Sequence, residues 1–325
     1  MMLISTRSSI STSESSIDSL TDEEVYNLMF KIQWEGDSVG YDPSIDFGIP
    51  PVFRIAPDAV AKLVRRSNTN ESYTMQYVAS RSNILIPTVR RVLPNKEHAN
   101  TYWIVMDYVE GETLQDAWPR MSWWRRLWVV WTLRRYMRQL HRLPLPNPGI
   151  PGPADGSGEP LRCYAPHLPY HGAGPFASYD ELAKWHDCQR YCHQVRSHQM
   201  FRELWRCPKF DMSSPLVLCH ADLHLRNIMV DNKEGRVWLL DWANSGAFPP
   251  WWDYVHLAGW ADAWRPAVRL PKTFSIFLPF MVGNYGRLYR EYWKDLTAQI
   301  QSVDCEELQT EVVDYFEKLG IYIDV

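Results

Sequence analysis

The chain has 325 residues, enough for one large or two modest domains with a substantial hydrophobic core. Hydrophobic residues make up 46% and charged residues 22%, which is ordinary for a soluble globular protein. The formal net charge of -4 argues against a nucleic-acid-binding protein, which would normally carry a basic domain.

The cysteines and the N-terminus indicate the expected compartment. The six cysteines form no C-x-x-C pair, so neither a zinc ribbon nor a disulfide framework is indicated. No secretory signal is visible at the N-terminus, and no apolar run is long enough to span a bilayer. We therefore expect a cytoplasmic protein with neither a membrane partner nor a nucleic-acid partner.

The first third of the chain has a strand–strand–helix–strand–strand pattern. Residues 1–20 are rich in serine and are predicted to be a disordered arm. Thr21-Asp22-Glu23-Glu24 has the pattern of a capping box that opens a helix running to Ile32. The elements that follow are a hairpin of strands 52–55 and 59–64 around a turn at 56–58, a helix at 71–79, and strands at 88–93 and 102–108.

A helix is predicted from Ser122 to Leu140, where tryptophans and arginines alternate with helical spacing. Its apolar residues are Trp124, Leu127, Trp128, Trp131, Tyr136 and Leu140. Basic residues with tryptophan are also the ingredients of a helix that lies on a membrane surface. Such a stripe more often packs in a core, so we expect core packing with the arginines facing solvent.

Residues 143–178 are rich in proline and glycine, and an insert of this length without regular structure is uncommon within a domain. One hypothesis is a loop over the substrate site that offers Tyr164, His167, Tyr170 and His171 for contacts; the other is a surface excursion. A helix is expected at 179–205. It carries His186, Cys188, Cys192 and His193, but these offsets lack a convincing second pair of zinc ligands.

The most informative stretch runs from Pro215 to Asp253. A short strand at 216–218 leads into a loop that holds His220, Asp222, His224 and Asn227. Two further strands, 228–230 and 237–240, flank turn residues 231–235 and predict a β-hairpin, after which Asp241 follows at once. The loop and Asp241 should therefore converge on one spot.

Phosphoryl transfer needs this set of side chains. In H-x-D-L-x-x-x-N an aspartate can accept the proton of the attacking hydroxyl, while the asparagine offers an amide oxygen to Mg²⁺. Magnesium prefers hard oxygen ligands, and a carboxylate such as Asp241 supplies a charged one. A structural alternative is a buried loop in which Asp222 and Asn227 only cap turns.

His220-Ala221-Asp222-Leu223-His224-Leu225-Arg226-Asn227, followed by Leu240-Asp241-Trp242, resembles the aminoglycoside phosphotransferase/choline kinase family of protein-kinase-like enzymes. The stretch is most similar to the fungal branch of that family. The resemblance implies a bilobal α+β fold, with a small five-stranded antiparallel-sheet lobe at 21–109 and a larger, mainly helical lobe at 110–325. It also implies ATP and Mg²⁺ as cofactors.

The resemblance assigns roles to individual residues. Asp222 would orient or deprotonate the acceptor hydroxyl, and Asn227 with Asp241 would hold Mg²⁺. His220 would support the loop from behind, whereas His224 would either face the γ-phosphate or only pack; Arg226 would touch phosphate or be solvated.

For the nucleotide, the resemblance implies that Lys62 binds the phosphates and that Glu71 is its ion-pair partner. The backbone at Met106 and Tyr108, in the segment 106–111, would bind adenine. No G-x-G-x-x-G lies between residues 36 and 56, so a phosphate-covering loop is poorly defined.

After the hairpin, Asp253 matches the family's acidic residue that braces the catalytic loop. We also count Asp253, Trp251, Trp252 and Tyr254 as candidate substrate residues, because aromatic faces attract cations. Lobe packing is the commoner explanation for so many tryptophans. Residues 276–319 are expected to be helical, with a break at 302–304.

These features predict a small-molecule kinase that moves the γ-phosphoryl group of ATP, or less favourably GTP, to a hydroxyl group. Ala221 replaces a glycine usual in the family, and Ala243-Asn244 replaces an acidic or aromatic pair. No A-P-E follows Asp241, which disfavours a protein substrate. The alternatives are a catalytically silent kinase-like binding module and an enzyme of secondary metabolism that reuses the pocket for other chemistry. An aminoglycoside, a choline-like amine, a sugar or another metabolite all remain open as acceptors.

Overall fold

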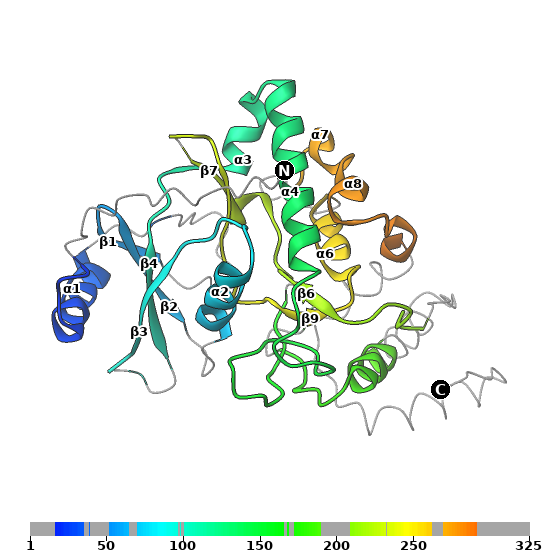
Figure 1. Ribbon diagram of the computed structural model, residues 1–325, viewed down its shortest axis with the longest axis horizontal. Helices are drawn as coiled ribbons and strands as arrows, with labels where there is room; N and C mark the ends of the chain where they lie inside the picture. Colours follow the sequence, from blue (N-terminus) through cyan, green and yellow to red (C-terminus); the bar gives the residue numbers. More distant parts are fainter. Residues whose placement is uncertain are drawn as a thin grey trace, which may run out of the picture. The chain divides into compact units, whose positions relative to one another are not determined.

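Figure 1 shows the computed structural model, in which two compact units are distinguished. The structure describes residues 17–35, 39, 52–64, 70–96, 98, 101–165, 168, 172–189, 209–231, 233–261 and 269–290. Unit 1 comprises Met1–Ser67 with Pro87–Val109, and unit 2 comprises Asn68–Ile86 with Glu110–Val325. Residues 68–86 thus belong to unit 2, although we expected them in the N-terminal lobe.

Unit 1 is built on an antiparallel sheet in the order β1-β2-β4-β3. Its strands, coloured blue to cyan in Figure 1, are β1 (Val52–Ala56), β2 (Ala59–Val64), β3 (Val89–Pro94) and β4 (Tyr102–Asp107). The β1–β2 hairpin is confirmed, with Val52 opposite Lys62 and Ala56 opposite Ala59. The described residues contain four strands of the five expected, and most of 36–51 lies outside them.

Helix α1 (Asp22–Glu35) begins with the predicted capping box. The backbone N–H of Glu24 donates to Thr21 Oγ1 at 3.3 Å, and the N–H of Thr21 donates to Glu24 Oε2 at 2.8 Å. Ile17, just before the helix, is buried in the same cluster as Val25 and Met29. Ile17 and Leu20 are therefore packed against unit 1, at the end of the arm that we expected to be disordered, while residues 1–16 lie outside the described residues.

The first half of unit 2 contains α2 (Asn70–Arg81), β5 (Gly111–Thr113), α3 (Leu114–Ala117), the 3-10 turn η2 (Trp118–Arg120) and α4 (Trp123–Leu140). Helix α4 begins as predicted, since the Ser122 side chain caps it. The expected core stripe on α4 is wrong for its tryptophans. Tyr136 and Leu140 of the expected stripe are buried, as predicted. Beside them the helix buries Val129, Val130, Thr132, Leu133 and Met137 in place of the tryptophans.

Two small sheets carry the central stretch of unit 2. One has the order β5-β7-β8 and contains the predicted hairpin of β7 (Ile228–Asp231) and β8 (Val237–Leu239). The other pairs β6 (Val217–Cys219) with β9 (Gly246–Phe248). Between β6 and β7 lies the 3-10 turn η3 (Leu225–Asn227), so the polar loop has a strand on each side.

The remaining described helices are α6 (Trp252–Ala261), α7 (Lys272–Ser275) and α8 (Leu278–Val282). Helix α8 packs against both α4 and α6. Residues 179–189 and 286–290 are also helical. The rest of the helices expected at 179–205 and 276–319 lies outside the described residues. Among the described helices none is both long and apolar enough to cross a bilayer.

The Pro/Gly-rich insert is packed into unit 2 over much of its length. Gly152 forms a two-way backbone bridge with Ala247 of β9, and residues 151–154 are buried. A Cβ at Gly246 would lie 2.4 Å from the carbonyl oxygen of Gly152, so only glycine permits this approach. The surface-excursion hypothesis is therefore wrong for this part. Of the residues proposed to contact substrate, Tyr164 is half-buried, and His167, Tyr170 and His171 lie outside the described residues.

Candidate active site

The carboxylate of Asp222 is held from two sides. Nε2 of His256, on α6, lies 3.1 Å from Asp222 Oδ1, and Nδ2 of Asn244 donates to Asp222 Oδ2 at 3.2 Å. We place the Nε2 proton on His256 because a lone pair would repel the carboxylate. Each carboxylate oxygen thus has a neighbouring donor and keeps lone pairs for a further one.

These donors set the charge of the site. Burial disfavours the ionised form of Asp222, but the hydrogen bond and electrostatic attraction of His256 outweigh it and lower the pKa of the carboxyl. Asp222 is therefore an anion at neutral pH. A carboxylate with a lowered pKa is a weak base, which suits it better to orienting a hydroxyl than to removing its proton early.

His220 ties the loop to the end of the hairpin. Its ring is buried, with Nε2 3.0 Å from the carbonyl oxygen of Leu240, and Nδ1 accepts the N–H of Asp222 at 3.3 Å. Burial lowers the pKa of His220, which favours the neutral ring. A neutral ring protonated at Nε2 satisfies both contacts, so His220 has the geometry of a loop support.

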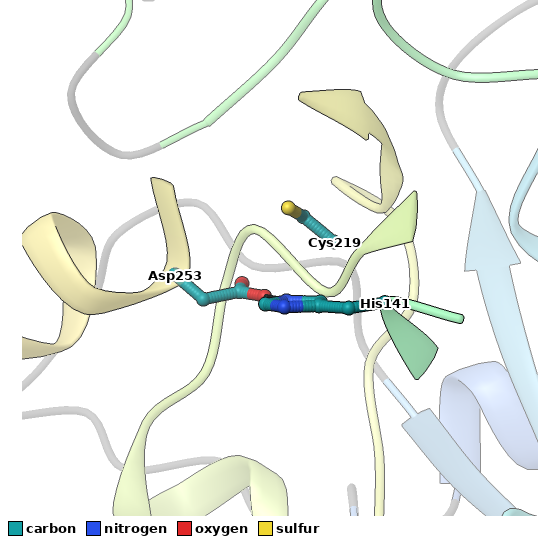
Figure 2. Close-up of side chains that lie close together, drawn as sticks. All are labelled: His141, Cys219 and Asp253. Atoms are coloured by element: carbon teal, nitrogen blue, oxygen red, sulfur yellow. Dashed lines mark hydrogen bonds and ion pairs between the residues drawn. The ribbon is translucent and has the colours of Figure 1, made fainter. Parts of the chain in front are cut away.

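Asp253 braces the same loop through the backbone. Its carboxylate accepts the N–H of His220 at 3.3 Å and that of Ala221 at 2.8 Å. His141 Nε2 lies 3.4 Å from Asp253 Oδ2, and Figure 2 shows the His141 ring directed at this carboxylate. Burial works against ionisation of Asp253, but His141 and the Ala221 N–H lower its pKa. Asp253 is completely buried, so its assignment as a substrate residue is wrong.

His141, Cys219 and Asp253 bring three potential metal-ligand atoms within 4.8 Å of one another. The thiol of Cys219 donates to the carbonyl oxygens of Phe248 and Pro249. Burial, together with the charge of Asp253, raises the pKa of Cys219 far above that of an ordinary thiol. All three side chains are hydrogen-bonded within the protein, which is the geometry of a brace for the loop.

The backbone at Ala221 explains why the family usually has glycine there. Ala221 has φ = 61°, in the left-handed region that glycine occupies most readily. The hydrogen bond from its N–H to Asp253 helps to hold this conformation. Asp241 also has a positive φ, of 60°, which aspartate tolerates better than most residues.

Asn227 and Asp241 are brought together by the hairpin. Asn227 precedes β7 and Asp241 follows β8, and the N–H of Leu240 donates to the carbonyl oxygen of Asn227 at 2.8 Å. The side-chain Nδ2 of Asn227 donates to the carbonyl oxygen of Asp222 at 2.9 Å, so its Oδ1 is the atom left to face a ligand. An amide oxygen beside a carboxylate fits the oxygen ligands that Mg²⁺ prefers.

His224 has the environment of a packing residue. It is buried, its Nδ1 accepts the N–H of Arg226 at 3.2 Å, and its ring packs edge-on against Trp260 with centroids 4.6 Å apart. These contacts favour packing over a position facing the γ-phosphate. Arg226 Nε also lies 3.4 Å from His224 Nδ1.

The predicted nucleotide-binding residues fall in different units. Lys62 is buried in β2 of unit 1, and Glu71 is buried in the first turn of α2 in unit 2. Their ion pair stays a prediction. At the predicted hinge, Met106 is buried in β4, and the N–H of Tyr108 already donates to the carbonyl oxygen of Asp58 at 2.8 Å. The Tyr108 N–H is thus engaged within unit 1.

The aromatic residues after the hairpin form core and not a cation-binding surface. Trp251 and Trp252 are at most 2% exposed, and Trp252 stacks on Phe248 with centroids 4.6 Å apart. Tyr254 is also buried, and its ring meets Tyr285 edge-on. The substrate assignment of Trp251, Trp252 and Tyr254 is therefore replaced by packing.

His186 belongs to the same aromatic core. Its ring stacks on Phe210 at 4.8 Å and meets Trp252 edge-on at 5.4 Å. Burial lowers the pKa of His186 to about 3. Cys192 and His193, which the zinc alternative also requires, lie outside the described residues.

Neither His256 nor Asn244 was predicted to belong to the site. His256 lies one helical turn after Asp253, so the two side chains share a face of α6. Since Asp253 braces the backbone at 220–221, the next turn of α6 was placed to reach residue 222. Asn244 carried no such signal, because its position depends on the turn that follows Asp241.

Comparisons with known proteins identify the family of the chain. The model of the phosphotransferase enzyme family matches residues 48–278, more than half of the chain, which therefore belongs to that family. An aminoglycoside 3'-phosphotransferase from Streptomyces ribosidificus is 26% identical over 188 residues. That match covers 56% of this chain and 63% of the relative, so the chain spans less than two thirds of its length.

Two solved structures resemble the fold. Aminoglycoside phosphotransferase APH(4)-Ia is 14% identical, with 91% of this chain and 95% of that chain covered and a TM-score of 0.50. The GDP complex of aminoglycoside 2'-phosphotransferase-IIIa is 11% identical, with 92% and 98% covered and a TM-score of 0.50. The chain has their bilobal, protein-kinase-like α+β fold, as expected. Membership of a fungal branch stays a prediction.

Proposed function

We propose that this protein is an ATP-dependent phosphotransferase that moves the γ-phosphoryl group to a hydroxyl of a small molecule. The observation that carries the proposal is the anionic Asp222 carboxylate, held by His256 and Asn244. It lies in a loop that His220 and Asp253 fix from the other side. A merely structural loop would not need an ionised side chain held ready at its centre.

Asp222 would accept a hydrogen bond from the acceptor hydroxyl and so aim its oxygen at the γ-phosphorus. As the new P–O bond forms, the bond between phosphorus and the β–γ bridging oxygen breaks, and ADP leaves. The hydroxyl proton passes to Asp222 late in the step. Positioning and charge stabilisation supply most of the catalysis in this type of reaction.

Asn227 Oδ1 and the Asp241 carboxylate would hold Mg²⁺. The ion would neutralise the phosphate oxygens of the nucleotide. Lys62, paired with Glu71, would contact the α- and β-phosphates, and the backbone near Met106 would bind adenine. Among solved relatives of the same fold, one is a GDP complex, so GTP is the competing donor.

The acceptor class follows the relatives' names. The curated relative is an aminoglycoside 3'-phosphotransferase and both solved structures are aminoglycoside phosphotransferases, which supports a polyhydroxylated, amine-bearing acceptor. Choline-like amines and simple sugars satisfy the same chemistry at Asp222.

Two measurements test the function. In a thermal-shift titration, ATP with Mg²⁺ should raise the melting temperature more than ATP with EDTA. The protein is then incubated with ATP, Mg²⁺ and a panel of aminoglycosides, choline and sugars, and mass spectrometry should find an acceptor that gains one phosphoryl group. Absence of any nucleotide-dependent shift, for ATP and for GTP, would contradict the proposal.

A further inference from the structure

Helix α4 presents a row of exposed tryptophans. The exposed fractions are 81% for Trp124, 57% for Trp131, 49% for Trp123 and 41% for Trp128. Trp124, Trp128 and Trp131 are spaced by four and three residues, so they share one side of the helix. Large apolar side chains gathered on a surface in this way mark an interaction site.

The surface continues onto the segment that contains α7 and α8, beside α4 in Figure 1. The ring of Trp123 lies 5.9 Å from that of Phe277, and the ring of Trp131 lies 6.0 Å from that of Phe280. Ile276 and Phe280 are 64% and 40% exposed. We call this surface the tryptophan face; it consists of Trp123, Trp124, Trp128, Trp131, Ile276 and Phe280.

The two segments that form the tryptophan face carry charges of one sign. Residues 122–140 and 269–283 contain seven basic residues and no acidic residue, in a chain that has more acidic than basic residues overall. The basic residues are Arg125, Arg126, Arg134, Arg135, Arg138, Arg269 and Lys272. Arg135 and Arg138 are exposed, and Arg125 and Arg134 lie over the rings of Trp128 and Phe280 at 4.4 Å and 4.2 Å. Charge complementarity therefore favours an anionic partner.

We propose that the tryptophan face docks this protein on the surface of a bilayer that contains anionic lipids. Tryptophan favours the boundary between headgroups and acyl chains, because it has a large apolar body and a polar N–H. Guanidinium groups bind lipid phosphates through paired hydrogen bonds. The five arginines of α4 require the helix to lie on the surface and not to span the bilayer.

A second copy of the chain fits this surface less well. A two-fold dimer would place the same patch against itself, and with it the same seven basic residues. Like charges across an interface are unfavourable, and the two segments have no carboxylate to offset them. The proposal is independent of the phosphotransferase activity, and it differs from our expectation of no membrane partner.

Vesicle co-sedimentation of the full chain tests the proposal. Wild-type protein should bind vesicles of phosphatidylcholine mixed with phosphatidylserine, bind phosphatidylcholine alone weakly, and lose binding as salt rises. The double variant Trp124→Ala/Trp131→Ala should bind the anionic vesicles about tenfold or more weakly. Phe30→Ala, which removes an aromatic side chain of α1 that is 42% exposed, is the matched control and should bind like wild type.

A second variant separates charge from packing. Arg135→Glu/Arg138→Glu leaves every tryptophan in place and should also lower binding about tenfold or more. Brominated acyl chains should quench the fluorescence of wild type more than that of the double tryptophan variant. Circular dichroism checks the fold of each variant.

Two results would overturn the proposal. One is that wild-type protein does not bind anionic vesicles at low salt, or that both double variants bind them as well as wild type does. The other is a dimer in light scattering that Trp124→Ala/Trp131→Ala converts to a monomer, which would assign the tryptophan face to self-association.

Discussion

The carboxylate of Asp222 is held in place by side chains from two different segments of the chain. His256 and Asn244 hold Asp222, while His141 and two backbone N–H groups hold Asp253. Both aspartates are therefore ionised and oriented before any substrate arrives. In the proposed reaction His256 would be a positioning residue, because it would act through Asp222.

Replacing His256 should impair turnover more than acceptor binding. His256→Ala removes the donor to Asp222 Oδ1, and we expect kcat to fall roughly 10- to 100-fold, as for a misplaced catalytic group. His256→Gln keeps an N–H donor and should recover part of the loss. Without His256 the burial of Asp222 is less opposed, so the acidic limb of the kcat–pH profile should move to higher pH. An unchanged profile in His256→Ala would rule out this role.

Ala221 tests the left-handed backbone of the loop. Ala221→Gly relieves the strain of φ = 61° but loses a buried methyl group and loosens the unfolded chain, so stability should change by no more than about 1 kcal/mol. Ala221→Val adds a β-branched side chain at a fully buried, left-handed position and should cost about 3 kcal/mol or more. Urea unfolding measures both. Equal stability of the glycine and valine variants would contradict the observed backbone.

At the scale of elements, the Pro/Gly-rich insert is part of the packed structure. Its bridge from Gly152 to Ala247 lies beside the β6–β9 pair, from which the catalytic loop departs. The close approach of Gly246 to the backbone of residues 152–153 leaves no room for a side chain. The insert thereby supports the strand that leads into the site.

Gly246→Ala tests how much the packing of the insert against β9 contributes to stability. The new methyl group meets backbone atoms, which cannot rotate away, and we expect a loss of roughly 2–3 kcal/mol of stability. Gly158→Ala is the control: its φ is +84°, nothing lies within 4 Å of an added Cβ, and backbone strain alone should cost about 1–2 kcal/mol. If the two variants lose equal stability in urea unfolding, the insert is not held as described.

The elements that could be predicted from the sequence are those with local signals. The capping box of Thr21 and Glu24 and the turn residues of both hairpins act within a few positions, and each was found at its place. The three-residue strands β5 and β9 were missed because they owe their conformation to distant partners. The face of α4 was misassigned because the helix has two apolar sides, and only packing selects Val130 and Leu133 over Trp124 and Trp131.

For the whole molecule, buried neutral histidines should make stability depend on pH. His186 has a pKa of about 3 in the folded chain, far below its usual 6.5, because burial disfavours its charged form. The unfolded chain therefore binds more protons between about pH 6.5 and pH 3, and stability falls as pH falls through that window. Burial lowers the pKa of His220 as well, which adds a loss of the same sign.

Substitution of His186 isolates the contribution of this residue to the pH dependence of stability. Above pH 6.5, His186 should make almost no contribution to the pH dependence of the free energy of unfolding. Below pH 6, its contribution should lower the free energy of unfolding of wild type by up to about 1.4 kcal/mol for each pH unit. His186→Phe keeps a ring against Phe210 and Trp252 but cannot bind a proton. Its plot of unfolding free energy against pH should therefore be less steep than that of wild type between pH 6.5 and pH 4, by up to about 1.4 kcal/mol per pH unit. Urea unfolding at several pH values measures both curves, and parallel curves would contradict the assignment of a buried neutral ring.

The central claim is that Asp222 works with Asn227 and Asp241 in phosphoryl transfer. The most direct measurement compares the rate of phosphoryl transfer by wild type and by Asp222→Asn. The rate is measured with water and with any acceptor found by mass spectrometry, and the affinity for ATP with Mg²⁺ is measured for both proteins. The account predicts that Asp222→Asn lowers turnover by about 10²- to 10⁴-fold while nucleotide affinity is retained. Wild-type turnover in the Asp222→Asn protein would contradict it.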